Sequence, residues 1–382
     1  MTTRRGFLAL SLGASAAAAL SAPRLSALAA DTASAPLGRR IVADWHSHFF
    51  THAELRALSS RTQAPRITLD AQGKPWLQNI TTASAAAGKP GVYSPSDVQA
   101  RLAHLDAHGI ERQLITQTVA LGLDATLPVE ELKPLFRAVN DELAEVVHAH
   151  PDRFLGVAAL PTGDPAWAAE ELRRAHRELG LIGGSLPLNA FASLEGARTL
   201  APVFTEAQKH GSHFFIHRGP ASSKVPGQPP LVVPTDTDGV RWSLISNAHL
   251  SAGTITLGLT DFLDPYPDVT VEIVMLGGFA PYLLDSWVQA GGQLGVADPL
   301  ARLRRLYLDT GPYSRNGEWV AQAAAKLGAD RILFGTDYGV GGGTNGDVGP
   351  GIASLEKALT PAQQQAIFVD NSRRLLQLKG RA

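Results

Sequence analysis

Short, nearly continuous apolar runs alternate with longer amphipathic segments along most of this chain, and this alternation constrains the fold more than any other feature. The apolar runs cover 40–45, 112–118, 154–161, 181–188, 212–219, 269–276, 305–311 and 331–339. Runs of this kind are typical of strands buried on both faces of a parallel sheet. The segments between them carry apolar residues at helical spacing and stop at glycine or proline. Eight strands with helices between them predict an α/β fold, the (β/α)8 TIM barrel.

A doubly wound parallel sheet is the alternative fold, but the sequence contains no glycine-rich phosphate loop to support it. Two stretches do not fit the alternation. Residues 61–95 are rich in Pro, Gly, Thr and Ser, and we expect them to form an insertion over the C-terminal mouth of the barrel. Residues 219–240 form a Pro-rich loop after the fifth strand. A lid over a site and a tolerated surface loop are equally compatible with either stretch.

Composition excludes several classes of function. The 382-residue chain has a net charge of -1 and 18% charged residues, with no long run of one sign. These values argue against a nucleic-acid or anionic-membrane partner. The chain has no cysteine, which excludes disulfides, thiolate zinc sites and cysteine nucleophiles.

The N-terminal segment predicts export rather than a part of the fold. Arg4 and Arg5 precede Phe7, an Ala-rich apolar stretch follows, and Ala27 and Ala29 form an A-x-A cleavage pattern. We therefore expect residues 1–29 to be a twin-arginine signal peptide and residues 30–382 to be one barrel domain in the periplasm. An ordinary secretory signal or a disordered tail is the alternative. The apolar stretch is too short and Ala-rich for a stable membrane anchor.

Four candidate metal ligands lie at the ends of three of the predicted strands. His46 and His48 follow the first strand, and residues two apart in a strand project to the same side. His217 ends the fifth strand, and Asp337 ends the eighth, where a carboxylate needs a partner. At the mouth of a barrel these side chains can converge into a mononuclear site of three nitrogens and one oxygen, open to water or substrate. This donor set favours one divalent transition-metal ion, zinc ahead of manganese, over magnesium or calcium.

The motifs that contain these residues resemble those of the amidohydrolase-related family, in the branch of 2-amino-3-carboxymuconate-6-semialdehyde decarboxylase and the resorcylate-type decarboxylases. The resemblance covers nearly all of the mature chain and rests on "DWHSH", "PDRFLGVAALP", "FFIH", "PDVTVEIVMLGGFAPYLLD", "ILFGTDY" and "IFVDNSRRLLQL". It implies that His46 and His48 are strand 1 ligands, that His217 is the strand 5 ligand, and that Asp337 is the strand 8 ligand and a catalytic residue. It also implies a small-molecule substrate and a homodimer.

One position departs from the family pattern. The sixth strand of the family usually ends in His-x-Gly-Gly, whereas this chain reads Met275-Leu276-Gly277-Gly278. A thioether does not carry a proton at ordinary pH and is a weak ligand for zinc. The resemblance favours a carboxy-lyase acting on a carboxylated aromatic or muconate-like molecule. The alternatives are a metal-dependent hydrolase of a lactone, ester or amide, and a catalytically inactive binding protein.

Several other residues are weaker candidates for a role at the site. Asp309 at the end of the seventh strand is either an outer partner of the metal site or a structural acceptor. Arg218 could meet a substrate carboxylate, although a surface position is the simpler expectation. His249 could replace the missing histidine, and Tyr338 could donate to a substrate or only pack. His104 is expected to be solvated on a helix.

Overall fold

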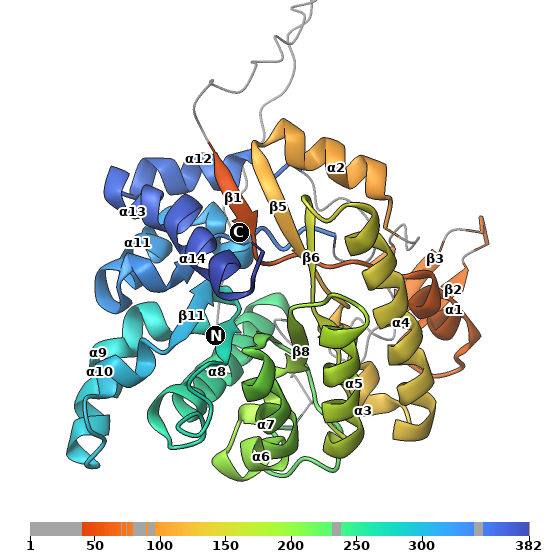
Figure 1. Cartoon of the computed structure of the whole chain (residues 1–382), viewed down its shortest axis with the longest axis horizontal. Coiled ribbons are helices and arrows are strands. Elements are labelled where there is room, and N and C mark those ends of the chain that lie inside the picture. The colour runs from red at the N-terminus through yellow and green to blue at the C-terminus, as the bar shows by residue number, and fades with distance from the viewer. Residues whose placement is uncertain are drawn as a thin grey trace, which may run out of the picture. The chain divides into compact units, whose positions relative to one another are not determined.

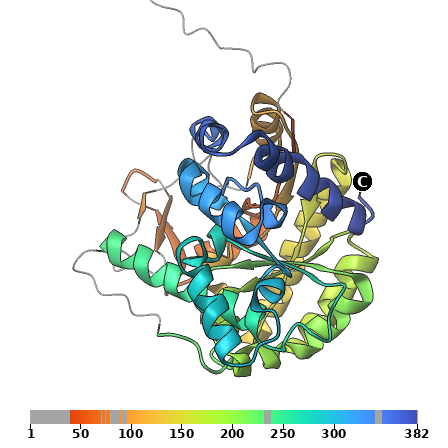
Figure 2. The ribbon, with the colours of Figure 1, turned by 90° about the vertical axis from the view of Figure 1, so that its left-hand side faces the viewer.

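The computed structural model describes residues 40–69, 71–73, 75–78, 89–90, 96–230, 238–339 and 347–381. The predicted signal segment lies outside these residues, and so does 231–237 of the predicted Pro-rich loop. Strands and helices alternate along the described chain, with the helices outside the strands (Figures 1 and 2).

The strands of the barrel pair in parallel, and each overlaps one of the predicted apolar runs. They are β1 (Ile41–Asp44), β5 (Ile110–Ile115), β6 (Phe154–Gly156) with its continuation β7 (Ala158–Ala159), β8 (Gly183–Pro187), β9 (His213–His217), β10 (Thr270–Ile273), β11 (Leu306–Asp309) and β12 (Ile332–Leu333). Two contacts close the ring: the Trp45 N–H donates to the Phe334 carbonyl at 2.8 Å, and Ser47 pairs with Tyr338 in parallel. The predicted (β/α)8 barrel is therefore confirmed, and the doubly wound alternative is wrong.

The helices begin and end close to the capping, proline and glycine residues of the sequence. Those of at least 8 residues are α1 (His52–Ser60), α2 (Val98–Ala107), α4 (Val129–Ala149), α5 (Pro165–Arg177), α7 (Ala201–His210), α8 (Asp238–Leu259), α9 (Ala280–Gln293), α11 (Gly317–Leu327), α12 (Gly349–Ala358) and α14 (Asn371–Leu378). Shorter helices are α3 (Leu123–Thr126), α6 (Leu194–Thr199), α10 (Pro299–Leu303) and α13 (Pro361–Gln365). Helix α5 is an example of a helix start set by the sequence. The Asp164 side chain accepts from the Trp167 N–H, and Pro165 starts the first turn.

Alternation along β9 separates the outer core from the barrel interior. Phe214 is fully buried and packs against Phe204 of α7, with ring centroids 4.5 Å apart. Burial of a side chain of this size contributes about 1.5–3 kcal/mol. Phe215 projects to the other side, where its ring lies 5.1 Å from the ring of His46. His217 follows two residues later on the same side, so the strand that builds the outer core also carries a histidine into the barrel.

The insertion predicted at 61–95 contains a small antiparallel sheet. Its strands are β2 (Arg66–Leu69), β3 (Pro75–Gln78) and β4 (Lys89–Pro90). Because this sheet lies in the chain between the end of β1 and the start of α2, it belongs to the carboxyl-terminal end of the barrel, as expected. Residues 79–88 and 91–95 of the insertion lie outside the described structure.

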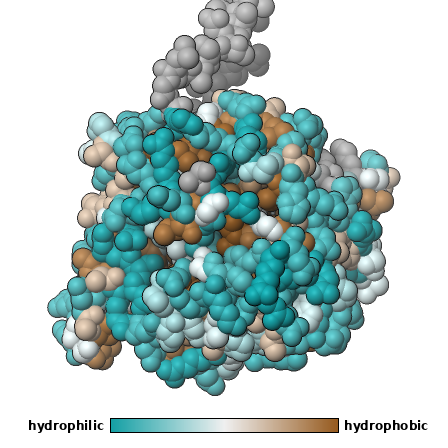
Figure 3. Space-filling model, viewed as in Figure 1, coloured by the Kyte–Doolittle hydropathy of each residue, from teal (hydrophilic) through white to brown (hydrophobic). Residues whose placement is uncertain are grey.

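Hydrophilic residues predominate on the face of the molecule shown in Figure 3, with apolar residues mostly between them. Of the helices in the described ranges, none combines the length and the apolar composition needed to cross a membrane.

Candidate metal centre

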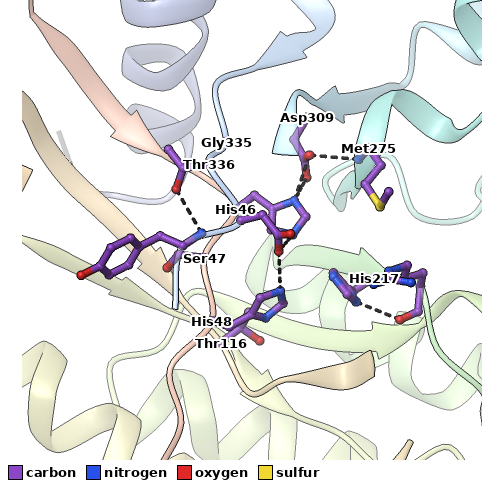
Figure 4. A network of polar contacts seen from close by, with 12 residues as sticks. His46, Ser47, His48, Thr116, His217, Met275, Asp309, Gly335 and Thr336 are labelled. Carbon is purple, nitrogen blue, oxygen red and sulfur yellow. Dashed lines mark hydrogen bonds and ion pairs between the residues drawn. The ribbon is translucent and has the colours of Figure 1, made fainter. Parts of the chain in front are cut away.

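The four predicted ligands lie together at the carboxyl ends of the strands. His46 and His48 follow β1, His217 ends β9, and Asp337 follows β12. Each offers one donor atom, and these four atoms all lie within 4.8 Å of one another. Figure 4 shows the three imidazoles arranged around one space. Segments up to 291 positions apart in the sequence thus converge as the barrel predicts, although whether the residues bind a metal remains a prediction.

The three imidazoles are packed edge to face inside the barrel. The ring centroids are 5.4 Å apart for His46 and His48, 5.2 Å for His46 and His217, and 4.7 Å for His48 and His217. The three histidines are at most 2% exposed. The side chain of Asp337, by contrast, is 25% exposed. The carboxylate is therefore the member of the set that faces the opening of the barrel.

Hydrogen bonds fix the orientation of two of the rings. His217 Nδ1 lies 2.8 Å from the Arg218 carbonyl, which can only accept, so this nitrogen carries the proton. His46 Nδ1 lies 3.0 Å from both oxygens of Asp309, and Figure 4 shows this contact on the side of the ring opposite the ligand space. A carboxylate or carbonyl that holds one nitrogen leaves the other nitrogen with its lone pair available to a metal.

Unsatisfied nitrogens support the fit of a metal ion. His46 Nε2 and His48 Nδ1 are buried and have no hydrogen-bond partner of good geometry in the described structure. Asp337 Oδ1 lies 3.1 Å from His48 Nε2 and 3.3 Å from His46 Nε2. Buried polar atoms without a partner are rare and require an explanation. A divalent cation among three imidazoles and one carboxylate supplies one, and the four residues fit a single divalent metal ion.

The protonation states also suit a cation. Burial lowers the pKa of His46, but the charges and hydrogen bonds of Asp309 and Asp337 outweigh it and raise that pKa to about 10. Burial opposes ionisation of Asp337, but His46 and His48 hold its pKa well below the ordinary value. Burial lowers the pKa of His48, and burial with the neighbouring imidazoles lowers that of His217 well below its ordinary value. A metal ion must therefore compete with one proton, that on His46.

Left-handed backbone marks the ends of β10 and β12. Asp337 has φ +61°, and Met275 and Leu276 both have φ +56°. Such values are tolerated by Asp but are unusual for bulky side chains, with a typical cost of about 1–3 kcal/mol each. The turn at Met275 also directs its N–H to Asp309 Oδ1 at 3.0 Å, as Figure 4 shows. Three of the four non-glycine positions with positive φ among the described residues thus lie at the candidate site, and the fourth is Asp298 at the start of α10.

The weaker sequence candidates separate into two groups. Asp309 is fully buried against His46, and Arg218 is partly buried beside the centre rather than on the open surface. Tyr338 packs: its ring stacks on His104 at 3.9 Å and lies under the Arg101 guanidinium at 4.9 Å. The expectation that His104 is solvated was therefore wrong. His249 lies half-buried on α8 and is not part of the described cluster of four candidate ligands.

A buried polar layer under the ligands was not predicted. Arg101, 2% exposed, donates to the His48 carbonyl at 2.6 Å and to Gln113 Oε1 at 2.7 Å. Gln113 in turn donates to Asp44 Oδ2 at 2.7 Å. Gln113 is a polar residue inside an apolar run, and this position could have indicated a buried polar layer. Arg101 could not, because it lies in an ordinary amphipathic helix.

A cavity of about 570 Å³ lies on the β10 and β11 side of the mouth. Its lining is mainly apolar and includes Leu276, Phe279 and Tyr313. The Tyr313 hydroxyl donates to Asn247 Oδ1 of α8 at 2.9 Å. Leu276 directly follows Met275, so the cavity adjoins the strand end that departs from the family pattern.

A parallel barrel with three histidines and one aspartate at the ends of its strands defines a (β/α)8 protein with a candidate metal centre. A sequence profile of the amidohydrolase family matches residues 43–378. The chain belongs to the amidohydrolase family, which confirms the resemblance found in its motifs.

Curated relatives agree with this assignment, and solved structures share the fold. The chain is 28% identical over 269 residues to gamma-resorcylate decarboxylase from Rhizobium sp. strain MTP-10005, covering 63% of this chain and 77% of the relative. It is 31% identical over 121 residues to 2-amino-3-carboxymuconate-6-semialdehyde decarboxylase from Dictyostelium discoideum, covering 32% and 33%. A crystal structure of a dihydroxybenzoic acid decarboxylase from Polaromonas sp. JS666, with bound manganese and 2-nitroresorcinol, shares the fold with a TM-score of 0.63 and 20% identity. That match covers 90% of this chain and 98% of the other.

We predict that the purified chain holds about one transition-metal ion and that His46→Ala and His217→Ala each release it, because each removes one of four ligands. Metal content measured by elemental analysis after metal loading and desalting checks this. His150→Ala, on a histidine outside the ligand set, is the control and should keep the ion. Wild-type protein without bound metal after loading would contradict the assignment.

Proposed function

We propose that the chain is a metal-dependent decarboxylase that acts on a small carboxylated aromatic or muconate-like molecule. The observation that carries the proposal is the convergence of the four candidate ligands and of one cationic side chain, Arg218, on the barrel mouth. The decarboxylases among its relatives support the same class of reaction.

The metal ion is held by His46, His48, His217 and Asp337 in this proposal. When bound, it supplies a positive charge that stabilises the negative charge developing as the carbon–carbon bond breaks. Three imidazoles and one carboxylate accept zinc or manganese. Manganese in the Polaromonas structure does not support the sequence-based preference for zinc, and metal analysis of the purified chain decides between the two ions.

Arg218 binds the carboxylate of the substrate. Its guanidinium interacts electrostatically with Asp337, a candidate ligand, and with Tyr313, which lines the adjoining cavity. Burial lowers the pKa of Arg218, so the charge is only partly solvated. A substrate carboxylate that meets it gains charge-assisted hydrogen bonds in a site poor in water. The apolar lining at Leu276 and Phe279 suits a planar ring.

Asp337 is the residue to which we assign the proton transfer of the reaction. Loss of carbon dioxide leaves a carbanionic carbon that must take up one proton. Met275 has no titratable group, whereas the Asp337 carboxyl is partly exposed and lies at the opening. We therefore assign proton delivery to Asp337, whose lowered pKa keeps it ionised in the free site. It first takes the proton from a water molecule at the opening, and the hydroxide left behind combines with the released carbon dioxide to form bicarbonate. A hydrolase would instead need a base for water, and Asp337 is again the residue placed for it. Product analysis separates these two reactions.

We predict that metal-loaded protein releases carbon dioxide from 2,6-dihydroxybenzoate or a related hydroxybenzoate. Chromatography of the decarboxylated product measures this reaction. Arg218→Met should raise KM by about 10–100-fold, the value of a charge-assisted hydrogen bond, and Arg218→Lys should recover part of it. Arg198→Met on the exposed surface of α6 is the control. Turnover of lactones, esters or amides without carbon dioxide release would favour the hydrolase. An unchanged KM in Arg218→Met would remove Arg218 from the site.

Met275→His tests whether methionine removed activity or reshaped the pocket. We predict a loss or only a modest change in kcat, because an imidazole would replace apolar bulk beside Leu276 and its cavity. The assay uses preparations with matched metal content, since a new imidazole could reposition the ion. A gain of about 10²–10⁴-fold, the usual value of a general base, would contradict the prediction. Complete inactivity of both proteins on every substrate, with metal bound, would favour the binding-protein alternative.

We also propose that residues 1–29 direct export of the folded barrel to the periplasm and that the mature protein is a homodimer; Arg4 and Arg5 before Phe7 support the export route. We predict that Arg4→Lys together with Arg5→Lys retains the precursor in the cytoplasm, measured by cell fractionation. Undiminished periplasmic protein would contradict the twin-arginine route. Sedimentation of the purified protein tests the dimer.

A further inference from the structure

A chain of buried polar side chains leads from the metal centre into the barrel. His46 Nδ1 lies 3.0 Å from both oxygens of Asp309 on β11. The Asp309 carboxyl contacts that of Glu272 on β10. Glu272 Oε2 lies 2.8 Å from His213 Nε2 on β9, and His213 Nδ1 lies 3.0 Å from Thr270 Oγ1. His46, Asp309, Glu272 and His213 are all fully buried.

The two carboxyl groups differ in the hydrogen-bond donors that reach them. It accepts from His46 Nδ1 and from the Met275 N–H, which lies 3.0 Å from Oδ1. Glu272 accepts no backbone N–H among the described residues, and only His213 offers it a side-chain donor. Donors that stabilise a negative charge are thus concentrated on Asp309.

Two carboxyl groups in contact require a proton between them. Glu272 Oε1 has no donor among the described residues, as expected if this oxygen itself carries the proton and donates to Asp309. Burial, followed by the nearby charges of Asp309 and Asp44, raises the pKa of Glu272 well above its ordinary value. His213 offers no compensating charge, because burial and Lys379 lower its pKa well below the ordinary value.

The remaining hydrogen bonds are then satisfied when they run in one direction. The Thr270 hydroxyl, whose oxygen also lies 3.5 Å from the Ser212 carbonyl, donates to His213 Nδ1 at the shorter distance of 3.0 Å, and His213 Nε2–H donates to Glu272 Oε2. Glu272 Oε1–H donates to Asp309, which also accepts from His46 Nδ1–H. Once a metal ion displaces the extra proton of His46, this direction leaves the lone pair on Nε2, the nitrogen without a good hydrogen bond in the ligand space.

We propose that Glu272 is a positioning residue of the metal centre, a neutral carboxylic acid that donates to Asp309 and thereby holds His46 with Nδ1–H toward the barrel and Nε2 toward the metal. The inference rests on the metal centre of the proposed function but not on the reaction it catalyses. It makes strands β9, β10 and β11 jointly responsible for one ligand of β1.

Two substitutions test whether Glu272 acts as a neutral hydrogen-bond donor, as a negative charge, or only by filling space. Glu272→Gln keeps an oxygen for His213 and an N–H donor for Asp309, so metal affinity and kcat should stay close to wild type. Glu272→Leu keeps the size but removes the donor. Its metal affinity should fall by about 10–100-fold, the usual effect of losing an outer partner of a metal ligand. Competition with a chromophoric chelator measures the affinity of metal-free protein for added zinc and manganese.

A matched control separates positioning from stability. Glu171 is also fully buried, but it accepts from Asn140 and Arg174 between α4 and α5. Glu171→Gln should lower the unfolding temperature and leave metal affinity unchanged. Circular dichroism before metal loading shows whether each variant is folded. If Glu272→Leu does not fold, the Gln variant and the infrared measurement below decide the question.

Infrared difference spectra test the proton itself. Wild-type protein should show the carbonyl band of a buried carboxylic acid that Glu272→Gln lacks and Glu171→Gln retains. Loss of metal affinity in Glu272→Gln comparable to that in Glu272→Leu, a wild-type affinity in a folded Leu variant, or the absence of the band would each overturn the inference. If wild-type protein binds no metal, the proposed function fails on its own, and the band still reports whether Glu272 is neutral.

Discussion

The contact between His46 and Asp309 joins the first strand of the barrel to the seventh, and the candidate site depends on it. The 3.0 Å distances from Nδ1 to both carboxylate oxygens orient the ring, and Asp309 in turn accepts the Met275 N–H that ends β10. Because the strands are parallel, their carboxyl ends meet at one rim, and a side chain anchored there is held by several strands at once. The ligand set is therefore a consequence of barrel closure as much as of the histidines themselves.

Backbone strain and buried charge are concentrated at this rim. Positive φ values at Met275, Leu276 and Asp337 occur where the strands turn into their loops. A regular turn would be more stable locally, but it would not direct the Met275 N–H to Asp309 or the Asp337 carboxylate toward His48. The outer shell, exemplified by Phe214 against Phe204, has ordinary apolar packing that can sustain such local costs.

The sequence was sufficient for the barrel and for the convergence of the four candidate ligands because both follow from local patterns. Apolar runs without alternation identify buried parallel strands, and polar residues at their ends, such as His46 and Asp337, identify the rim. The stacking of Tyr338 on His104 and the hydrogen bonds of Arg101 could not be predicted, because they depend on which helix face meets which loop. Glu272 and His213 were inside runs assigned to strands, and only the three-dimensional register of β9 and β10 reveals that they pair.

The barrel interior is consequently more polar than its stability alone would require. Burying Glu272, His213 and Asp309 removes each from water, and a partly satisfied network of this kind is worse than an apolar core. It is tolerable if every donor meets an acceptor, and a single proton placed between Glu272 and Asp309 satisfies that condition along the whole chain of contacts. The same proton leaves one negative charge beside His46 rather than two, enough to hold the imidazole in one orientation as a neutral ligand. A second charge there would raise the proton affinity of His46 further and make the site compete less well for a metal ion.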